Sequence, residues 1–479
     1  MTEDAGQTIA QHLASLAFAT DAENLPERHR ASVPERILDV LGICVRATEL
    51  DTSHAVRDHV TDQGGRPQSS AIGAGVRLPA SSAALLNGTL AHSLDYDDTH
   101  LPSILHPSAS VVPSALAAAE AHGRSGAELV AAVAVGLEVT VRIGMAGYDG
   151  ERRQNVWFDR GQHATAICGA VGSAAAAAKL AGLDAAGIAD AMGVAASMSS
   201  GIIEANRTGG TVKRIHCGWA AHAGITASEL VARGLSGPPT VFEGRFGLFE
   251  AFLGEQARPQ EVLAGFDDDP GTNEWCVADI FFKPYPANHY THTAVDAAIQ
   301  LREAGLVPAE VRSAHLGVAS ATVRTIGEPL AAKQRPETGY QAQFSGPFAV
   351  AAALTGGDGL GLGLGDFDDA RVHDPDLMAL MSRITVGPDE SCDAVYPHQF
   401  PAVLTVTTTS GEELRAAVMA NRGGARRPLS TEELCTKFSD NTAGLLAPAA
   451  RDSLISTVAV LEELRDLAPL MDPLRDLVP

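Results

Sequence analysis

The first 265 residues form a succession of segments that either carry apolar side chains at positions i, i+3 and i+4 or are rich in alanine. Both patterns are typical of α-helices, and Gly, Pro and Ser residues separate the segments. One segment, GSAAAAAKLA at 172–181, consists almost entirely of small residues, which lets neighbouring helices approach closely. The sequence therefore predicts helices at residues 37–48, 81–92, 113–122, 127–146, 164–181, 185–199 and 216–233.

The pattern changes near residues 267–270, where three aspartates precede a proline. Beyond this point, alternating and β-branched residues predict strands, and helical patterns accompany them. The expected strands are 312–319 and 403–409, and the expected helices are 294–304, 344–355 and 374–382. Residues 431–464 are again helical in pattern, with Ser430 or Thr431 as the N-cap.

The predicted fold is mostly α-helical. At about 100–200 residues per domain, a chain of 479 residues accommodates two or three domains. Residues 1–266 are expected to form a large all-helical domain, and residues 267–427 a smaller α+β domain. Residues 428–479 are expected to return to the helical domain, which is thus built from both ends of the chain.

Composition and charge narrow the range of partners. Hydrophobic residues make up 45% of the chain and charged residues 19%, which is typical of a globular protein. The formal net charge of −23 argues against nucleic acid or an anionic membrane as the main partner. An anionic substrate would have to bind in a local cationic pocket, against the overall field of the protein.

Three features point to a cytoplasmic protein. The most apolar helical segment, 129–147, contains Glu138 and Arg142, which argues against a membrane span. The N-terminal MTEDAGQT is acidic and lacks the apolar core of a secretory signal. The six cysteines are scattered and include no CxxC pair, which is typical of reduced thiols rather than of disulfides or a zinc site.

The densest group of polar residues lies at 91–110, within an otherwise apolar region. His106 comes just before the helix that is expected to start near 111–113, and a helix N-terminus favours an anion and a neutral imidazole. The same residues also fit a solvated loop whose aspartates cap the next helix. The polar residues of interest are His92, Asp95, Asp97, Asp98, Thr99, His100 and His106.

Two further basic residues precede expected helices. His163 opens the helix at 164–181, and Lys213 follows the Gly209-Gly210 pair just before the helix that begins near His216. One such residue alone is usually a capping or surface residue, but three in one domain point to a shared anion site. Lys283 adds another cation, which two neighbouring prolines hold on an extended chain.

Several known templates are absent from the sequence. It contains no HExxH, no GxSxG and no P-loop Gly-Lys-Ser/Thr motif. The acidic stretch 95–98 could hold a divalent metal in a helical fold, but its spacing is not DDxxD and no second acidic motif accompanies it. No metal and no cofactor are therefore predicted.

Several long motifs, in order along the chain, resemble the MmgE/PrpD family. The resemblance covers nearly the whole chain and implies a helical domain, an α+β lid, a homodimer and no iron–sulfur cluster. It is carried by LDYDDTHLPSILHPSA (94–109), RGQHATAICGAVGSAAAAAKLAGL (160–183), VKRIHCGWAAHAGI (212–225), FEGRFGLFEAF (242–252), KPYPANHYTH (283–292) and PLSTEELCTKF (428–438).

The resemblance also implies site residues, residue by residue. An active-site histidine of the decarboxylase pattern aligns with Asn288, next to His289, and its tyrosine has no counterpart around 326–330. These two differences argue against cis-aconitate decarboxylation. The positions that do match the pattern are Asp95, Thr99, His106, His163, Lys213 and Lys283.

The family includes dehydratases such as 2-methylcitrate dehydratase, cis-aconitate decarboxylases and an iminodisuccinate epimerase, which act on small di- and tricarboxylates. The leading expectation is a cofactor-independent dehydratase of 2-methylcitrate or a similar compound. Epimerisation or decarboxylation in the same site and a catalytically silent carboxylate-binding homologue are the alternatives. We expect His106 to act as the base or the acid, and Asp95 to orient it. His163 is expected to be the partner acid or a contact to a substrate carboxylate, and Thr99 a contact to a substrate hydroxyl. Lys213 and Lys283 are expected to stabilise the developing negative charge.

Overall fold

The computed structural model describes residues 6–477, apart from the side chains of Asn206 and Arg207. The acidic N-terminal segment was one reason to expect a cytoplasmic protein. Most of that segment, residues 1–5, lies outside the described residues. Helices account for 56% of the structure and its sheets are small, which confirms the predicted mostly α fold. The chain divides into two compact units, Met1–Ile280 with Asn441–Pro479 and Phe281–Asp440.

The first unit is a helical assembly with two short strand pairs. The strands are β1 (Ser69–Ser70) with β2 (Arg77–Leu78), and β3 (Tyr148–Asp149) with β4 (Gln154–Asn155). Its helices are α1 (Ile9–Ala19), α2 (Glu27–Ala47), α3 (Asp51–Gln63), α4 (Ala80–Ala91), α5 (Ser108–His122), α6 (Gly126–Met145), α7 (Val156–Asp159), α8 (Ala164–Leu180), α9 (Ala185–Met198), α10 (Ala205–Thr208), α11 (His216–Val231), α12 (Leu248–Phe252), α22 (Pro448–Ala459) and α23 (Ala468–Arg475).

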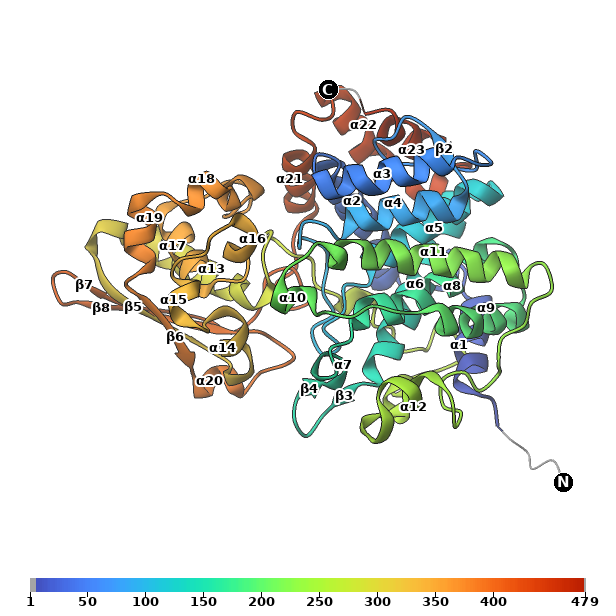
Figure 1. Cartoon of the computed structure of the whole chain (residues 1–479), viewed down its shortest axis with the longest axis horizontal. Coiled ribbons are helices and arrows are strands. Elements are labelled where there is room, and N and C mark those ends of the chain that lie inside the picture. Colours follow the sequence, from blue (N-terminus) through green and yellow to red (C-terminus); the bar gives the residue numbers. More distant parts are fainter. Residues whose placement is uncertain (1–5, 478–479) are drawn as a thin grey trace. The chain divides into compact units, whose positions relative to one another are not determined.

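Small residues let the central helices of this unit pack very closely. Helix α8 packs against α6, α9 and α11, and α11 also packs against α4 (Figure 1). A Cβ at Gly172 would lie 1.9 Å from Oγ1 of Thr140 on α6, and one at Gly218 would lie 2.2 Å from the carbonyl oxygen of Leu85 on α4. The close approach expected for segment 172–181 is confirmed. This packing holds the ends of α4, α8 and α11 close to one another.

Helix α5 begins earlier than the sequence predicts. It starts at Ser108 rather than near residue 113, and Pro113 lies inside it. Proline is favoured in the first turn of a helix, and the sequence therefore predicted a helix that starts near Pro113. The early start moves His106 to within two residues of the helix.

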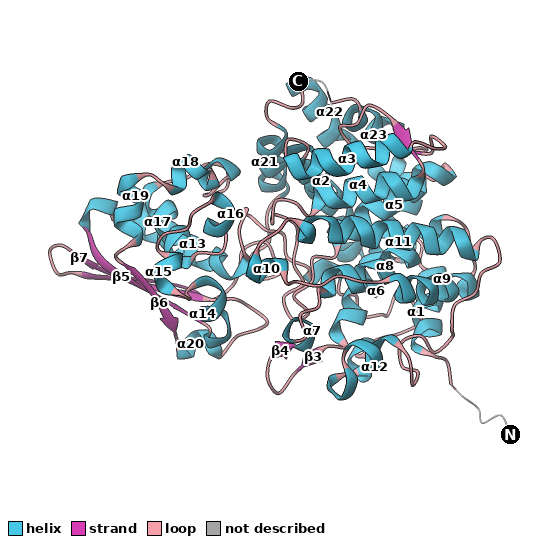
Figure 2. Ribbon diagram, viewed as in Figure 1, coloured by secondary structure: helices cyan, strands magenta, loops and turns pink. Residues whose placement is uncertain are grey.

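The second unit packs helices on a four-stranded sheet with the order β6-β5-β7-β8. Strand β5 is parallel to β6 and antiparallel to β7, which is antiparallel to β8. Helices α13 and α17 pack on this sheet and share its core (Figure 2). The strands are β5 (Val311–Val318), β6 (Ile384–Pro388), β7 (Ala402–Thr408) and β8 (Glu413–Val418), and the helices are α13 (His292–Glu303), α14 (Ser320–Ile326), α15 (Leu330–Lys333), α16 (Gly339–Ala342), α17 (Gly346–Thr355), α18 (Asp369–Val372), α19 (Pro375–Met381) and α20 (Glu390–Asp393).

The boundaries between the units lie later in the sequence than the expected 266/267 and 427/428. Buried polar contacts tie the segment before Ile280 to the first unit: Arg142 donates to the carbonyl oxygen of Glu274, and Arg36 donates to the carbonyl oxygen of Ile280. At the other boundary, α21 (Thr431–Thr442) begins in the second unit. The Oγ of Ser430 accepts a hydrogen bond from the N–H of Glu433, as the expected N-cap would.

Helix α6 contains the two charges that argued against a membrane span. Glu138 and Arg142 form a buried ion pair with an N···O distance of 2.7 Å. Among residues 6–477, no helix combines the length and the apolar character that a membrane crossing requires.

Candidate functional site

The polar segment forms the loop between α4 and α5 and is largely buried. His92 ends α4, and the side chains of Asp95, Asp97 and Thr99 are nearly inaccessible to solvent. Asp95 has a φ of 53°, in the left-handed region that aspartate tolerates better than most residues. A solvated loop, the structural alternative for this segment, would not bury these side chains.

Four imidazole rings lie next to one another at the ends of four elements. The ring of His92 lies 5.6 Å from that of His106 and 5.3 Å from that of His163, measured between centroids. The ring of His163 lies in turn 5.0 Å from that of His216. Helices α4, α8 and α11 and the loop before α5 therefore bring one histidine each to a shared cluster, which we call the histidine cluster (His92, His106, His163 and His216).

The loop's three aspartates each contact a different basic group. Asp97 Oδ2 lies 2.6 Å from Nδ1 of His92, and both side chains are fully buried. Asp95 Oδ1 lies 3.7 Å from Nζ of Lys213. Asp98 Oδ2 lies 3.2 Å from a guanidinium nitrogen of Arg36 on α2. Each carboxylate is thus balanced by its own cation or imidazole.

Asp98 also occupies the N-terminus of α5. Its Oδ1 accepts a hydrogen bond from the N–H of Ser108, and its Oδ2 accepts one from the Oγ of the same residue. Burial raises the pKa of Asp98 to about 6, although Arg36 and Ser108 act in the opposite direction. The anion at this helix N-terminus is therefore a side chain of the protein itself, whereas the sequence predicted a site for a bound anion there.

A backbone carbonyl fixes the tautomer of His106. Nδ1 of His106 lies 2.6 Å from the carbonyl oxygen of Asp98 and 3.3 Å from Oγ1 of Thr99. A carbonyl oxygen only accepts hydrogen bonds, so Nδ1 must carry the proton. The neutral ring then has its lone pair on Nε2, which is the form that a general base requires.

His163 and His216 are joined through their Nδ1 atoms, which lie 3.0 Å apart. Burial and the neighbouring His92 and Lys213 hold the pKa of His163 well below its usual value. Burial, together with the same two neighbours, lowers the pKa of His216 to about 4. Both rings are therefore neutral near pH 7.

Lys213 reaches this cluster from the short 3₁₀ turn Val212–Ile215, directly before α11. Its charge acts on both His163 and His216, whose pKa values it lowers. The first unit thus brings together five of the residues expected from the sequence, namely Asp95, Thr99, His106, His163 and Lys213.

Lys283 belongs to the second unit, where its side chain is 1% exposed. In the same unit Asn288 caps the 3₁₀ turn His289–Thr291 by accepting a hydrogen bond from the N–H of Tyr290. The adjacent His289 is buried, with its ring 4.5 Å from that of His292. The role of Lys283 as a substrate contact stays a prediction.

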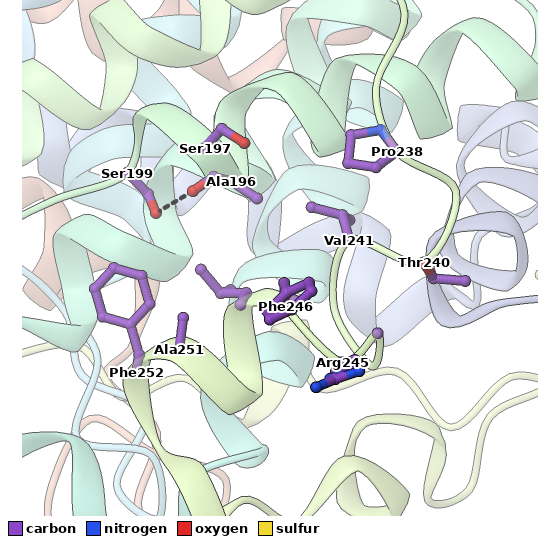
Figure 3. Close-up of a pocket in the computed structure, with 13 residues that line it drawn as sticks. Ala196, Ser197, Ser199, Pro238, Thr240, Val241, Arg245, Phe246, Ala251 and Phe252 are labelled. Carbon is purple, nitrogen blue, oxygen red and sulfur yellow. Dashed lines mark hydrogen bonds between the residues drawn. The ribbon is translucent and has the colours of Figure 1, made fainter.

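A cavity of about 380 Å³ lies elsewhere in the first unit, between the end of α9 and the segment before α12 (Figure 3). Of the described residues that line it, Arg245 alone is charged and none is a histidine. Proton transfer near neutral pH requires groups that titrate there, and arginine does not. The histidine cluster, rather than this cavity, is the candidate catalytic site.

No metal-binding group is evident at the histidine cluster. Within residues 6–477, no three or more His, Cys, Asp or Glu side chains gather as metal ligands would. The three aspartates of stretch 95–98 also contact separate basic groups and do not converge on one point. Metal independence of the reaction stays a prediction.

Sequence reasoning assigned no role at the site to four residues that the structure places there, namely His92, Asp97, His216 and Arg36. His92 and Asp97 belong to the polar segment, and their five-residue separation carries no recognised spacing. His216 is the first residue of an Ala- and Gly-rich helix, three positions after Lys213. A histidine at the start of an otherwise buried, small-residue helix is the signal that could have identified it.

Comparisons with known proteins cover both units. The MmgE/PrpD N-terminal domain model matches residues 11–260 and the C-terminal domain model matches residues 285–463. The human cis-aconitate decarboxylase is 29% identical over 483 residues, which covers 97% of this chain and 94% of the human protein. The mouse cis-aconitate decarboxylase is 29% identical over 97% of the chain and 93% of that protein, and the Aspergillus terreus enzyme is 27% identical over 84% and 82%.

The two domain models match in order and together span most of the sequence. The relatives are lyases aligned over nearly their full length. The chain therefore belongs to the MmgE/PrpD family and is an enzyme of the lyase class.

Proposed function

We propose that this chain is a cofactor-independent lyase that removes a proton next to a carboxylate group of a small di- or tricarboxylate, with loss of water as the leading reaction. The observation that carries this proposal is the state of His106. Its Nδ1 is committed to the carbonyl oxygen of Asp98, so its Nε2 holds the lone pair of the neutral ring. A base of this kind, in one cluster with the neutral His163 and His216 and near Lys213, suits abstraction of an α-proton.

Removing an α-proton places negative charge on the adjacent carboxylate, and that charge must be stabilised for the reaction to proceed. Lys213 is the cation of the first unit that we assign to this task. Asp95, whose Oδ1 lies 3.7 Å from Nζ of Lys213, holds the lysine in place. We therefore assign to Asp95 the positioning of Lys213. The carbonyl of Asp98, rather than Asp95, orients His106 in this proposal.

The leaving hydroxyl needs a proton, which we assign to His163. Its pKa lies well below the usual value, so its ring is neutral and donates from an N–H. In this scheme the α-proton passes to Nε2 of His106, the C–O bond breaks, and the hydroxyl leaves as water with the proton from His163. Thr99, whose Oγ1 lies beside His106, is assigned to a substrate hydroxyl or carboxylate, and Lys283 to a second carboxylate.

Decarboxylation is the second candidate, because curated relatives aligned over 97% of the chain are cis-aconitate decarboxylases. The same groups would then stabilise the charge left when carbon dioxide departs, and an imidazole N–H would protonate the carbon. The relatives share 29% of their residues with this chain, which supports the class of reaction more than the substrate.

The test is product analysis by NMR in D₂O with a panel of polycarboxylates that includes 2-methylcitrate and cis-aconitate. Loss of water from a hydroxy acid is the expected result. Loss of carbon dioxide would support the second candidate, and α-deuteration without elimination would indicate an epimerase. Binding without any turnover would overturn the enzymatic proposal and leave a silent carboxylate-binding homologue.

The proposal includes a homodimer that works in the cytoplasm. The family resemblance supports the dimer, and the scattered cysteines support a reducing compartment. The net charge of −23 argues against nucleic acid or an anionic membrane as a partner.

A further inference from the structure

We propose that His163 and His216 act as one unit that shares a single proton between their Nδ1 atoms, so that His216 sets whether His163 is an acid or a base. This inference rests on the proposed function, in which His163 gives a proton to the leaving group. It adds His216, which makes no assigned contact with substrate, as a positioning and proton-relay residue.

The geometry limits the pair to two neutral arrangements. The Nδ1 atoms lie 3.0 Å apart, a hydrogen-bond distance at which one nitrogen donates and the other accepts. If His216 donates, the proton of His163 is on Nε2, and His163 is an acid. If His163 donates, its Nε2 carries a lone pair, and His163 is a base.

Moving the shared proton converts one arrangement into the other without a net charge. When His163 gives its Nε2 proton to the leaving hydroxyl, its Nδ1 receives the proton of His216 Nδ1. His216 Nε2 takes up one proton at the same time from a water molecule, which is left as hydroxide, so both rings stay neutral. The cycle closes when the α-proton passes from His106 to His163 Nε2 and a proton leaves His216 Nε2 to neutralise that hydroxide, which also gives the α-proton a route to solvent.

The surroundings favour neutral rings. Lys213 and His92 face the pair, and they and burial hold the pKa values of both imidazoles below the usual value. His163 is 1% exposed and His216 7%, so His216 is the partner closer to water. The backbone at Gly201 covers the pair, since a Cβ there would lie 3.3 Å from that of His163 and 3.5 Å from Nδ1 of His216.

The first measurement does not depend on activity. In ¹⁵N-histidine-labelled enzyme without substrate, NMR should detect one protonated Nδ1 and one lone-pair Nδ1 in this pair, with a scalar coupling across the hydrogen bond. The coupling should be lost in His216→Asn and kept in His222→Asn, a control on the same helix whose Nδ1 contacts the carbonyl oxygen of Ser81. Protons on both Nδ1 atoms, or no coupling, would overturn the proposal even if the proposed reaction fails.

The second measurement separates a relay from a purely structural role. The side-chain amide introduced by His216→Asn can still hydrogen-bond to His163, but it cannot pass a proton. We expect kcat to fall roughly 10- to 100-fold in His216→Asn and in His216→Ala, with KM within about twofold, and free imidazole to restore activity to His216→Ala alone. Near-normal kcat in His216→Asn would show that only the hydrogen bond matters and would overturn the relay.

Discussion

At the scale of single residues, the chemistry open to His106 depends on one hydrogen bond. The carbonyl oxygen of Asp98 accepts from Nδ1 of His106 at 2.6 Å, and this acceptor does not titrate. The lone pair of the neutral ring is therefore on Nε2 at any pH at which the protein is folded. If the partner were a carboxylate instead, the orientation of the ring would depend on whether that carboxylate is protonated.

Lys213→Ala should impair catalysis with little effect on stability. The lysine lies in a short 3₁₀ turn that contains no fully buried residue, so little core packing should be lost although its side chain is only 16% exposed. Loss of a charge-assisted contact to a substrate carboxylate should cost about 2–4 kcal/mol in kcat/KM. Steady-state kinetics on the identified substrate and urea unfolding measure the two effects.

A matched control for this change is Arg214→Ala. The adjacent arginine donates to Oγ1 of Thr52, and kcat/KM should change less than about twofold. Equal losses in both variants would mean that the turn was disturbed, and unchanged kcat/KM in Lys213→Ala would remove this lysine from the site.

The sequence predicted the residues of the site that fall within motifs, but not those that complete their surroundings. His106, His163 and Lys213 stand out because each precedes a helix. His92 and His216 contact them only because α4, α8 and α11 pack closely at their ends, which no spacing along the chain encodes. The sequence likewise did not predict which basic group contacts each aspartate of the segment 95–98.

At the scale of elements, the buried pair of Arg36 and Asp98 joins α2 to the start of α5. Arg36→Met should lower the free energy of unfolding by about 3–5 kcal/mol, because it leaves a buried carboxylate without its cation. Urea unfolding at pH 7.5 measures this loss. The double variant with Asp98→Asn should recover part of it, whereas simple additivity of the two losses would contradict the pairing.

The histidines at the starts of α8 and α11 predict acid sensitivity. The pKa of His216 falls from 6.5 to about 4 on folding and that of His163 also falls, so the unfolded chain binds more protons in this range. The contribution of these two histidines to the free energy of unfolding should therefore be fully present above pH 6.5 and should decrease as the pH falls toward 4. Asp98, with its raised pKa of about 6, acts in the opposite direction between about pH 4 and 6.

His216→Asn isolates one part of this dependence. The slope of unfolding free energy against pH should be smaller in this variant by up to about 1.4 kcal/mol per pH unit between pH 4 and 6.5. Urea unfolding at several pH values measures the slope. Identical slopes in the two proteins would contradict a neutral, buried His216 in the native state.

Helices with a strong apolar period were predictable, and their starts less so. The start of α8 at Ala164 and that of α9 at Ala185 agree with the sequence. Helix α3 (Asp51–Gln63) was not predicted, because it is polar and buries only Ser53 and Val60. Its stability comes from packing against α4 rather than from a pattern of its own.

At the scale of the whole molecule, a chain with a net charge of −23 contains a candidate catalytic cluster whose cations, Arg36 and Lys213, are paired with the nearby carboxylates Asp98 and Asp95. The three aspartates are engaged by Arg36, His92 and Lys213. We predict that activity survives exhaustive treatment with EDTA. Activity that vanishes and returns with Mg²⁺ would revive stretch 95–98 as a metal site.

The central claim is that His106 is the base of a lyase, and the most direct test is the turnover of a folded His106→Asn enzyme. Asparagine keeps the hydrogen-bonding size of the side chain but cannot carry a proton, so the variant should fold and bind a carboxylate analogue. We predict that its turnover of the identified substrate, followed by NMR, falls by about 10²–10⁴. Because asparagine is also a good helix cap, near-wild-type turnover would contradict the account and leave His106 with a structural role only.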